Sequence, residues 1–253
     1  MKTMDTNSDT EFSNYGLYDL DSDLELLLPN TVIKFHRISD NAFSYFRKNS
    51  EGIIVEKIIP VKSQNPKIEL APIRPLNHPA RRTSHMFLHF DKEIYLSENS
   101  AASIFVHCPI EIGIFLVHDS NHDSLDWITC NPLNSRFGLY GSPDTGTLCK
   151  YAKVSLATDY SDSNSYLEGV MQIIVENTLS FGQSISKIVF QITDNALYYQ
   201  DSKTIIDGIK ITMKKRAAVN IADVKTTVLE TDWSMSPTWE DKTASTHMEM
   251  GLE

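Results

Sequence analysis

The chain has 253 residues, of which 41% are hydrophobic and 22% charged, with a formal net charge of −10 and a pI near 5.3. This length suffices for one large all-β domain or for two domains of ordinary size. The composition is that of a soluble globular protein, and the negative charge disfavours general binding to nucleic-acid phosphates or to anionic membranes. We therefore expect no nucleic-acid partner.

Cysteine usage and the N-terminal sequence bear on the compartment. Cys108, Cys130 and Cys149 include no C-x-x-C pair and cannot all pair with one another. This pattern indicates a reducing environment with buried thiols. The N-terminal sequence is polar and acidic, unlike a signal peptide, and no uninterrupted apolar run is long enough to span a membrane. We expect a cytoplasmic protein without a transmembrane segment.

Short runs rich in Ile, Val, Phe and Tyr recur along the chain, separated by Gly, Pro, Asn, Asp and Ser. Helical periodicity is scarce, and the pattern is typical of a β-sandwich or barrel. Residues 1–13 are predicted to form a disordered polar tail, and residues 231–253 a flexible one. Strands are expected at residues 31–38, 42–48, 52–61, 86–90, 93–97, 103–109, 111–117, 125–130, 137–141, 146–157, 169–177, 185–193, 196–200, 204–215 and 224–230.

Two segments allow more than one interpretation. The Pro-rich residues 65–82 are predicted to be an extended connector or an edge segment, since Pro lacks the N–H that a central strand requires. Residues 165–180 could form a helix by length and pattern. Gly169 and the Ile-Ile-Val run favour a strand there.

The sequence RFGLYGSPDTGTLCKY, residues 136–151, has Gly141 and Gly146 at the spacing of a phosphate-binding loop. Such a loop needs a Lys after its second Gly and a helix after that. Here the Lys is missing, Pro143 removes an amide donor, and Asp144 carries a negative charge. The residues that follow alternate at period two, so we reject a nucleotide loop.

The same sequence is well suited to a β-hairpin. Residues 142–145 fit a type I turn with Pro at its second position, followed by Gly146 in a left-handed conformation. This turn pairs Tyr140 with Thr147 and Arg136 with Tyr151, which allows a cation–π contact in the second pair. Gly138 then leaves room for another group to approach the sheet, with Tyr140 lining that space.

At these residues the chain resembles a known family, domain of unknown function 432, an uncharacterised archaeal family. The hairpin carries most of the resemblance. Tyr15-Gly16, the sequence PIEIG at 109–113 and the IVEN and KIVFQI segments at 173–177 and 187–192 add to it. The resemblance covers residues 14–230. It implies an archaeal, β-rich cytoplasmic protein and assigns no activity.

We predict an all-β protein with two packed antiparallel β-sandwich-like units, residues 14–135 and 136–230. One large β-sandwich is the alternative, and the hairpin could be shared between the units. The leading functional hypothesis is a non-catalytic binding or assembly module, because no catalytic constellation is complete and aromatic residues flank glycine turns. The candidate binding residues are Glu111, Arg136, Gly138, Tyr140, Gly141 and Tyr151.

The rival hypothesis is a metal-dependent hydrolase that uses His118, His122 and Asp123. Imidazole and carboxylate groups are competent ligands for zinc or a related divalent metal, the one cofactor that the sequence suggests. A spacing of four residues aligns two imidazoles on a helix but not in a turn, and surface residues of a polar turn are the competing interpretation. A small-ligand sensor is a third hypothesis. A protein partner or self-association is compatible with the first.

Overall fold

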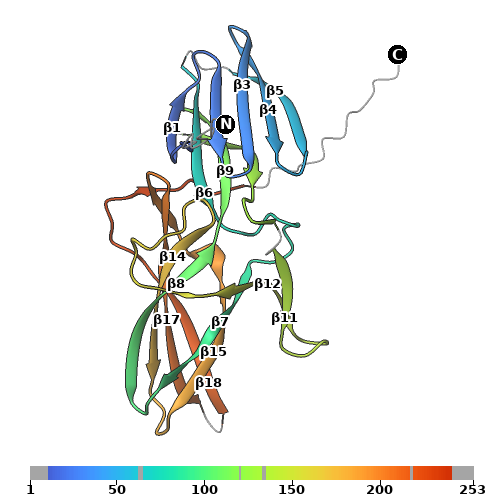
Figure 1. The fold of residues 1–253 in the computed structure, drawn as a ribbon. Coiled ribbons are helices and arrows are strands. Elements are labelled where there is room, and N and C mark those ends of the chain that lie inside the picture. Colours follow the sequence, from blue (N-terminus) through green and yellow to red (C-terminus); the bar gives the residue numbers. More distant parts are fainter. Residues whose placement is uncertain (1–10, 62–64, 120, 133–134, 217–218, 241–253) are drawn as a thin grey trace, which may run out of the picture.

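The computed structural model describes residues 11–61, 65–119, 121–132, 135–216 and 219–240 (Figure 1). The predicted all-β class is confirmed, since these ranges contain no α-helix, and the 3-10 helix Ile192–Asp194 has only three residues. In the same ranges there is no helix with the length and hydropathy needed to cross a membrane.

Two four-stranded antiparallel sheets form the part of the molecule at the top of Figure 1, here called the upper unit. One sheet has the order β1 (Gly16–Asp19), β6 (Lys67–Ile73), β9 (Glu111–His118), β10 (Asn121–Ile128); the other has β2 (Leu24–Leu28), β3 (Thr31–Ser39), β4 (Ala42–Asn49), β5 (Ile54–Pro60). Alternate residues of both sheets, including Phe35 and Tyr45 from one and Ile68 and Ile114 from the other, share one hydrophobic core.

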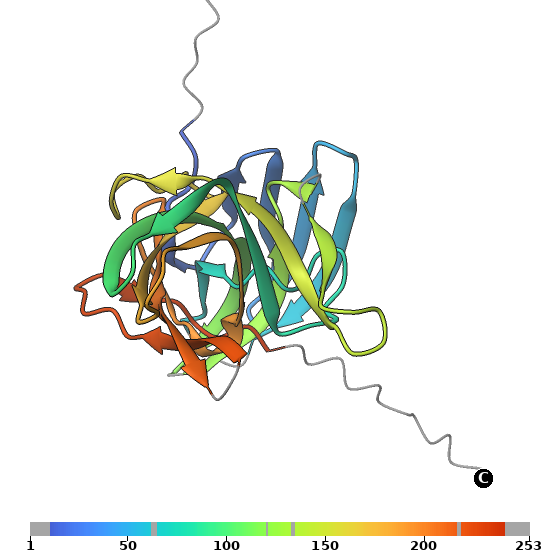
Figure 2. The same cartoon turned by 90° about the horizontal axis from the view of Figure 1, so that it is seen from below.

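The remaining strands form the lower unit, also in two sheets (Figures 1 and 2). The first has the order β11 (Arg136–Tyr140), β12 (Thr147–Val154), β7 (His85–Leu96), β15 (Gln183–Gln191). The second has β13 (Leu156–Ala157), β8 (Ser100–Pro109), β14 (Glu168–Asn177), β17 (Lys203–Arg216), β16 (Leu197–Gln200), β19 (Ser234–Met235), with β18 (Val219–Thr227) also on β17. The ambiguous segment 165–180 is therefore mainly a strand, β14, as predicted.

The sheets of the lower unit are mixed, whereas the prediction named antiparallel units. Strand β12 pairs with β7 in parallel, and β14 pairs with β17 in parallel. A tight hairpin forces an antiparallel pair, but long connections do not. Between β7 and β12 the chain runs through four other strands, β8 to β11, in the described residues, so no turn constrains their direction.

The two cores do not follow the predicted division at residue 135. Buried residues of β7 and β8, such as Met86 and Cys108, belong to the lower core together with β14 and β17. Strand β8 ends at Pro109 and β9 starts at Glu111, so consecutive strands enter different cores. Both strands are rich in apolar residues, so no boundary is visible at Ile110 in the sequence.

The Pro-rich segment 65–82 contains a central strand, contrary to the prediction. Strand β6 lies between β1 and β9. The pairing with β1 ends at Leu70, so Pro72, which pairs with Ile112 of β9, has a strand partner on one side only. A proline at this position therefore interrupts no second ladder.

The flexible-tail predictions need correction at both ends. Strand β19 pairs with β16, the N–H of Ser236 donates to the carbonyl of Leu197 at 2.8 Å, and the Trp239 ring packs against Phe115. At the other end, the N–H of Ser13 donates to the carbonyl of Leu27 at 2.8 Å. Residues 1–10 and 241–253 lie outside the described residues.

Candidate functional site

A buried carboxylate begins strand β9. Glu111 is 2% exposed and accepts hydrogen bonds from the backbone N–H groups of Asn77 and His78 at 3.0 and 2.8 Å. The side-chain amide of Asn77 donates a third, at 2.9 Å. Burial raises the pKa of Glu111, and these hydrogen bonds and the charge of Lys150 oppose that rise. The carboxylate thereby anchors the connector between β6 and β7.

A buried lysine lies beside this carboxylate. Lys150 is 4% exposed, and its ammonium group donates to the carbonyl oxygen of His78 and to the hydroxyl of Ser135. Burial lowers the pKa of Lys150, and the charge of Glu111 opposes the decrease. Sequence reasoning missed Lys150 as a site residue. Its alternation with the buried Ala152 and Val154 on β12 was the available signal.

Glu111 and Lys150 line a cleft of about 310 Å³ at the junction of the two units. The cleft draws residues from β9, β11, β12 and the start of β14, which the fold brings together from distant parts of the chain. Its polar lining includes Glu111, Ser135, Arg136, Lys150, Tyr151 and Glu168. Three of the six predicted binding residues, Glu111, Arg136 and Tyr151, therefore converge on one cleft.

The hairpin that carries Arg136 and Tyr151 has the predicted register. Arg136 pairs with Tyr151, Gly138 with Cys149 and Tyr140 with Thr147. The guanidinium carbon of Arg136 lies 5.7 Å from the centroid of the Tyr151 ring, so the predicted cation–π contact is present. This contact is worth roughly 0.5–1 kcal/mol at an exposed position.

The glycines of the turn differ from the prediction. Gly141, at φ +107°, adopts the left-handed conformation that was expected at Gly146. The N–H of Gly146 donates to the carbonyl of Ser142 at 2.7 Å, and a Cβ on Gly146 would lie 2.5 Å from that oxygen. Gly146 is therefore required by a close backbone approach, and Gly141 by its dihedral angle.

The space above Gly138 is occupied by the chain itself. The Phe87 ring of β7 lies 6.0 Å from the ring of Tyr140 and 5.4 Å from that of Tyr151, and it comes within 3.4 Å of the position of a Gly138 Cβ. Gly138 thus admits an internal aromatic contact. Tyr140 is 47% exposed and lies with Gly141 near the hairpin tip, outside the lining of the cleft.

The structure does not bring His118, His122 and Asp123 together. His118 lies 3.3 Å from Asp123, whereas His122 lies 2.8 Å from the buried Glu69. In the register of β9 and β10, His118 pairs with Asn121 and His122 with Val117, so alternation directs the two imidazoles to opposite faces of the sheet. Within the described ranges no group of three His, Cys, Asp or Glu side chains could hold a metal.

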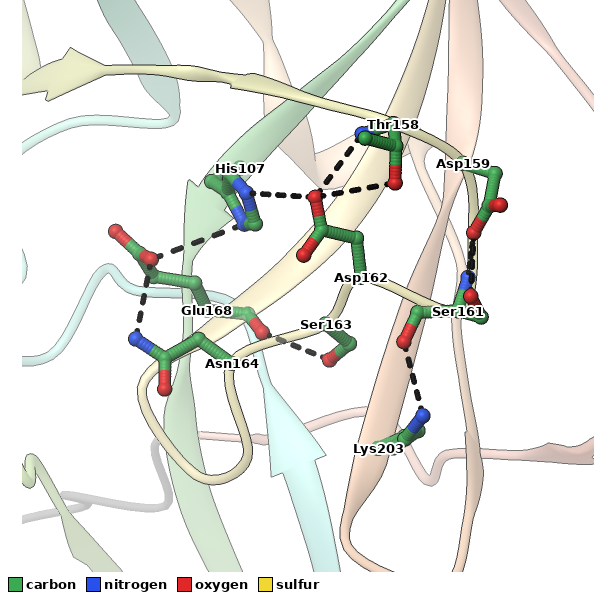
Figure 3. A network of polar contacts seen from close by, with 9 residues as sticks. All are labelled: His107, Thr158, Asp159, Ser161, Asp162, Ser163, Asn164, Glu168 and Lys203. Atoms are coloured by element: carbon green, nitrogen blue, oxygen red, sulfur yellow. Dashed lines mark hydrogen bonds and ion pairs between the residues drawn. The ribbon is translucent and has the colours of Figure 1, made fainter.

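A polar turn after β13 forms a network of contacts with His107 and Glu168 (Figure 3). His107 lies between two carboxylates, with ring nitrogens 3.7 Å from Asp162 and 3.9 Å from Glu168. The N–H of Thr158 donates to Asp162 at 3.0 Å, and the hydroxyl of Ser163 donates to the carbonyl of Glu168 at 3.0 Å. Glu168 belongs both to this network and to the cleft lining, so the network sets the position of an acidic side chain in the cleft.

Comparison with known proteins agrees with the resemblance noted in the sequence. No curated protein and no solved structure matches the chain at a significant level. The family model described as "Protein of unknown function (DUF432)" matches residues 14–251, which is nearly the whole chain and includes every residue of the cleft. The chain therefore belongs to the DUF432 family.

Proposed function

We propose that the protein is a binding module whose ligand occupies the cleft between the two units. The observation that carries this proposal is the convergence of Glu111 of β9 with Arg136 and Tyr151 of the hairpin, beside the buried Lys150. A volume of about 310 Å³ lies at the lower end of the range for small-molecule sites. The ligand is accordingly a small molecule, as in the small-ligand sensor hypothesis.

Most charged groups of the cleft already have internal partners. The carboxylate of Glu111 accepts three hydrogen bonds, and Lys153 pairs with Asp91 at 2.8 Å. Groups engaged in this way position the cleft walls rather than perform proton transfer, which favours binding over catalysis. Arg136 contacts the Tyr151 ring and has no carboxylate partner in the described part of the chain. Its guanidinium group suits a ligand that carries a carboxylate or phosphate.

A thermal-shift screen of dicarboxylates and phosphate monoesters, followed by calorimetric titration of the hits, tests this proposal. A ligand at about one hundred times its Kd stabilises the folded state by ~2.7 kcal/mol, which raises the Tm measurably. Arg136→Met should weaken binding of the hit about tenfold or more while leaving the Tm of the ligand-free protein nearly unchanged.

The matched control is Lys48→Met, which removes an exposed cation of β4 in the upper unit. This variant should bind the hit as tightly as the unmodified protein. If no compound of the panel shifts the Tm, or if Arg136→Met and Lys48→Met bind equally well, the cleft is not the ligand site.

A further inference from the structure

Strands β15 and β18 of the lower unit each have an unpaired edge. In the described residues β15 pairs only with β7, and β18 pairs only with β17, so each is the last strand on its side of a sheet (Figure 1). The backbone N–H and C=O groups along such an edge can hydrogen-bond an added strand. Strand β15 offers nine residues for this pairing.

A groove of about 760 Å³ lies along this edge of β15, and residues of β17 and β18 also line it. Polar and apolar residues both line it, and the apolar ones include Leu179, Ile185, Ile188, Ile211, Met213 and Val224. These side chains belong to the lower core or pack against it. Apolar side chains of an added strand would therefore extend an existing core and remove its rim from water. Tyr140, at the hairpin tip, also lines the groove.

Among the described residues, the groove lining carries basic side chains and no carboxylate, and the nearby Asp223 of β18 is paired with Lys214. The basic residues of the lining are His85 and Lys187. Two further lysines, Lys215 of β17 and Lys225 of β18, are exposed. They belong to strands that line the groove. In the ranges that the structure describes, none of these three lysines has a carboxylate partner. A cationic rim on a chain of net charge −10 is complementary to an acidic ligand.

We propose that the edge of β15 binds an extended segment of a partner protein in which apolar and acidic residues alternate. Side chains of a strand alternate between two faces. One face of the added strand would carry apolar side chains into the groove, and the other would carry carboxylates toward Lys187. This interaction surface uses residues other than those of the cleft and goes beyond the small-ligand function.

A labelled peptide of about seven residues, in which valine and glutamate alternate, is the probe, since strands are commonly this long. We expect it to bind the full chain in fluorescence anisotropy, and to slow amide exchange in residues 183–191 but not in β4. A second peptide with the same side chains and alternate N-methylated amides cannot form the backbone ladder. Its affinity for the chain should be lower by about tenfold or more. Equal binding of the two peptides would overturn strand addition.

Lys187→Glu should weaken binding of the valine–glutamate peptide about tenfold. It should strengthen binding of a peptide in which valine and lysine alternate. Lys48→Glu, the same change on an exposed lysine of the upper unit, should have neither effect. The proposal is overturned if the acidic peptide does not bind, or if both variants behave alike. It is also overturned if sedimentation shows a dimer that Lys187→Glu abolishes, because the occupant would then be a second copy of the chain.

Discussion

Glu111 and Lys150 form hydrogen bonds with the two backbone polar groups of the same residue, His78. The Glu111 carboxylate accepts the His78 N–H at 2.8 Å, and the Lys150 ammonium donates to the His78 carbonyl oxygen. Glu111 comes from β9 in the upper unit and Lys150 from β12 in the lower unit. The pair therefore holds the connector between the units from both sides, with both charges removed from water.

Removal of one member of this pair should destabilise the fold. Lys150→Met leaves Glu111 buried without its nearby cation and should lower the free energy of unfolding by about 3 kcal/mol. The double variant Lys150→Met/Glu111→Gln should lose less free energy of unfolding than the sum of the losses of the two single variants, by about 1 kcal/mol or more. Urea denaturation of the four proteins measures this coupling, and strictly additive losses would show that the two charges do not interact.

The raised pKa of Glu111 predicts a specific pH dependence. Between its ordinary value of 4.5 and the higher value in the folded state, the unfolded chain is ionised while the folded chain keeps the proton. Folding then takes up a proton, so this group's contribution to stability decreases as pH rises through that window. The stability of the unmodified protein relative to Glu111→Gln should therefore fall with pH from 4.5 upward. A difference independent of pH, measured by urea denaturation, would contradict the assignment.

Alanine substitutions at the three glycines of the hairpin should destabilise the protein to different extents. Gly146→Ala places a Cβ 2.5 Å from a backbone oxygen that cannot move freely, and should cost the most, about 2–3 kcal/mol. Gly141→Ala forces an alanine to φ +107° and should cost about 1–2 kcal/mol. Gly138→Ala makes only ordinary contacts with Phe87 and Tyr151 and should be nearly neutral. The order of the three Tm values tests this ranking.

The three thiols should be unreactive in the folded protein. Cys108, Cys130 and Cys149 are all buried, and burial raises the pKa of Cys108 and Cys130 to about 12. Against an ordinary value of 9.0, this lowers the thiolate fraction near pH 8 by about a thousandfold. Reaction with a thiol reagent should therefore occur at the rate of unfolding. Rapid labelling of even one cysteine under native conditions would indicate local opening at that strand.

Local chemistry accounts for the parts of the fold that were predicted well. The turn residues between Tyr140 and Thr147 set the hairpin register, because proline and glycine restrict the backbone without help from the rest of the chain. Strand β14 followed from its β-branched residues. The flexible-tail interpretation failed at Trp239, whose order depends on the Phe115 ring, a residue more than a hundred positions away.

The sequence by itself determined the all-β class, most of the strands, the hairpin with its Arg136–Tyr151 contact, and the family. These depend on side-chain alternation and turn chemistry, which act between residues close in sequence or directly cross-strand. Only the tertiary structure decided which strands share a core and that Glu111 and Lys150 meet at His78. It also decided that His118 and His122 point to opposite faces of their sheet. Those outcomes depend on pairings across long connections, and the identity of neighbouring residues does not constrain which distant strand completes a sheet.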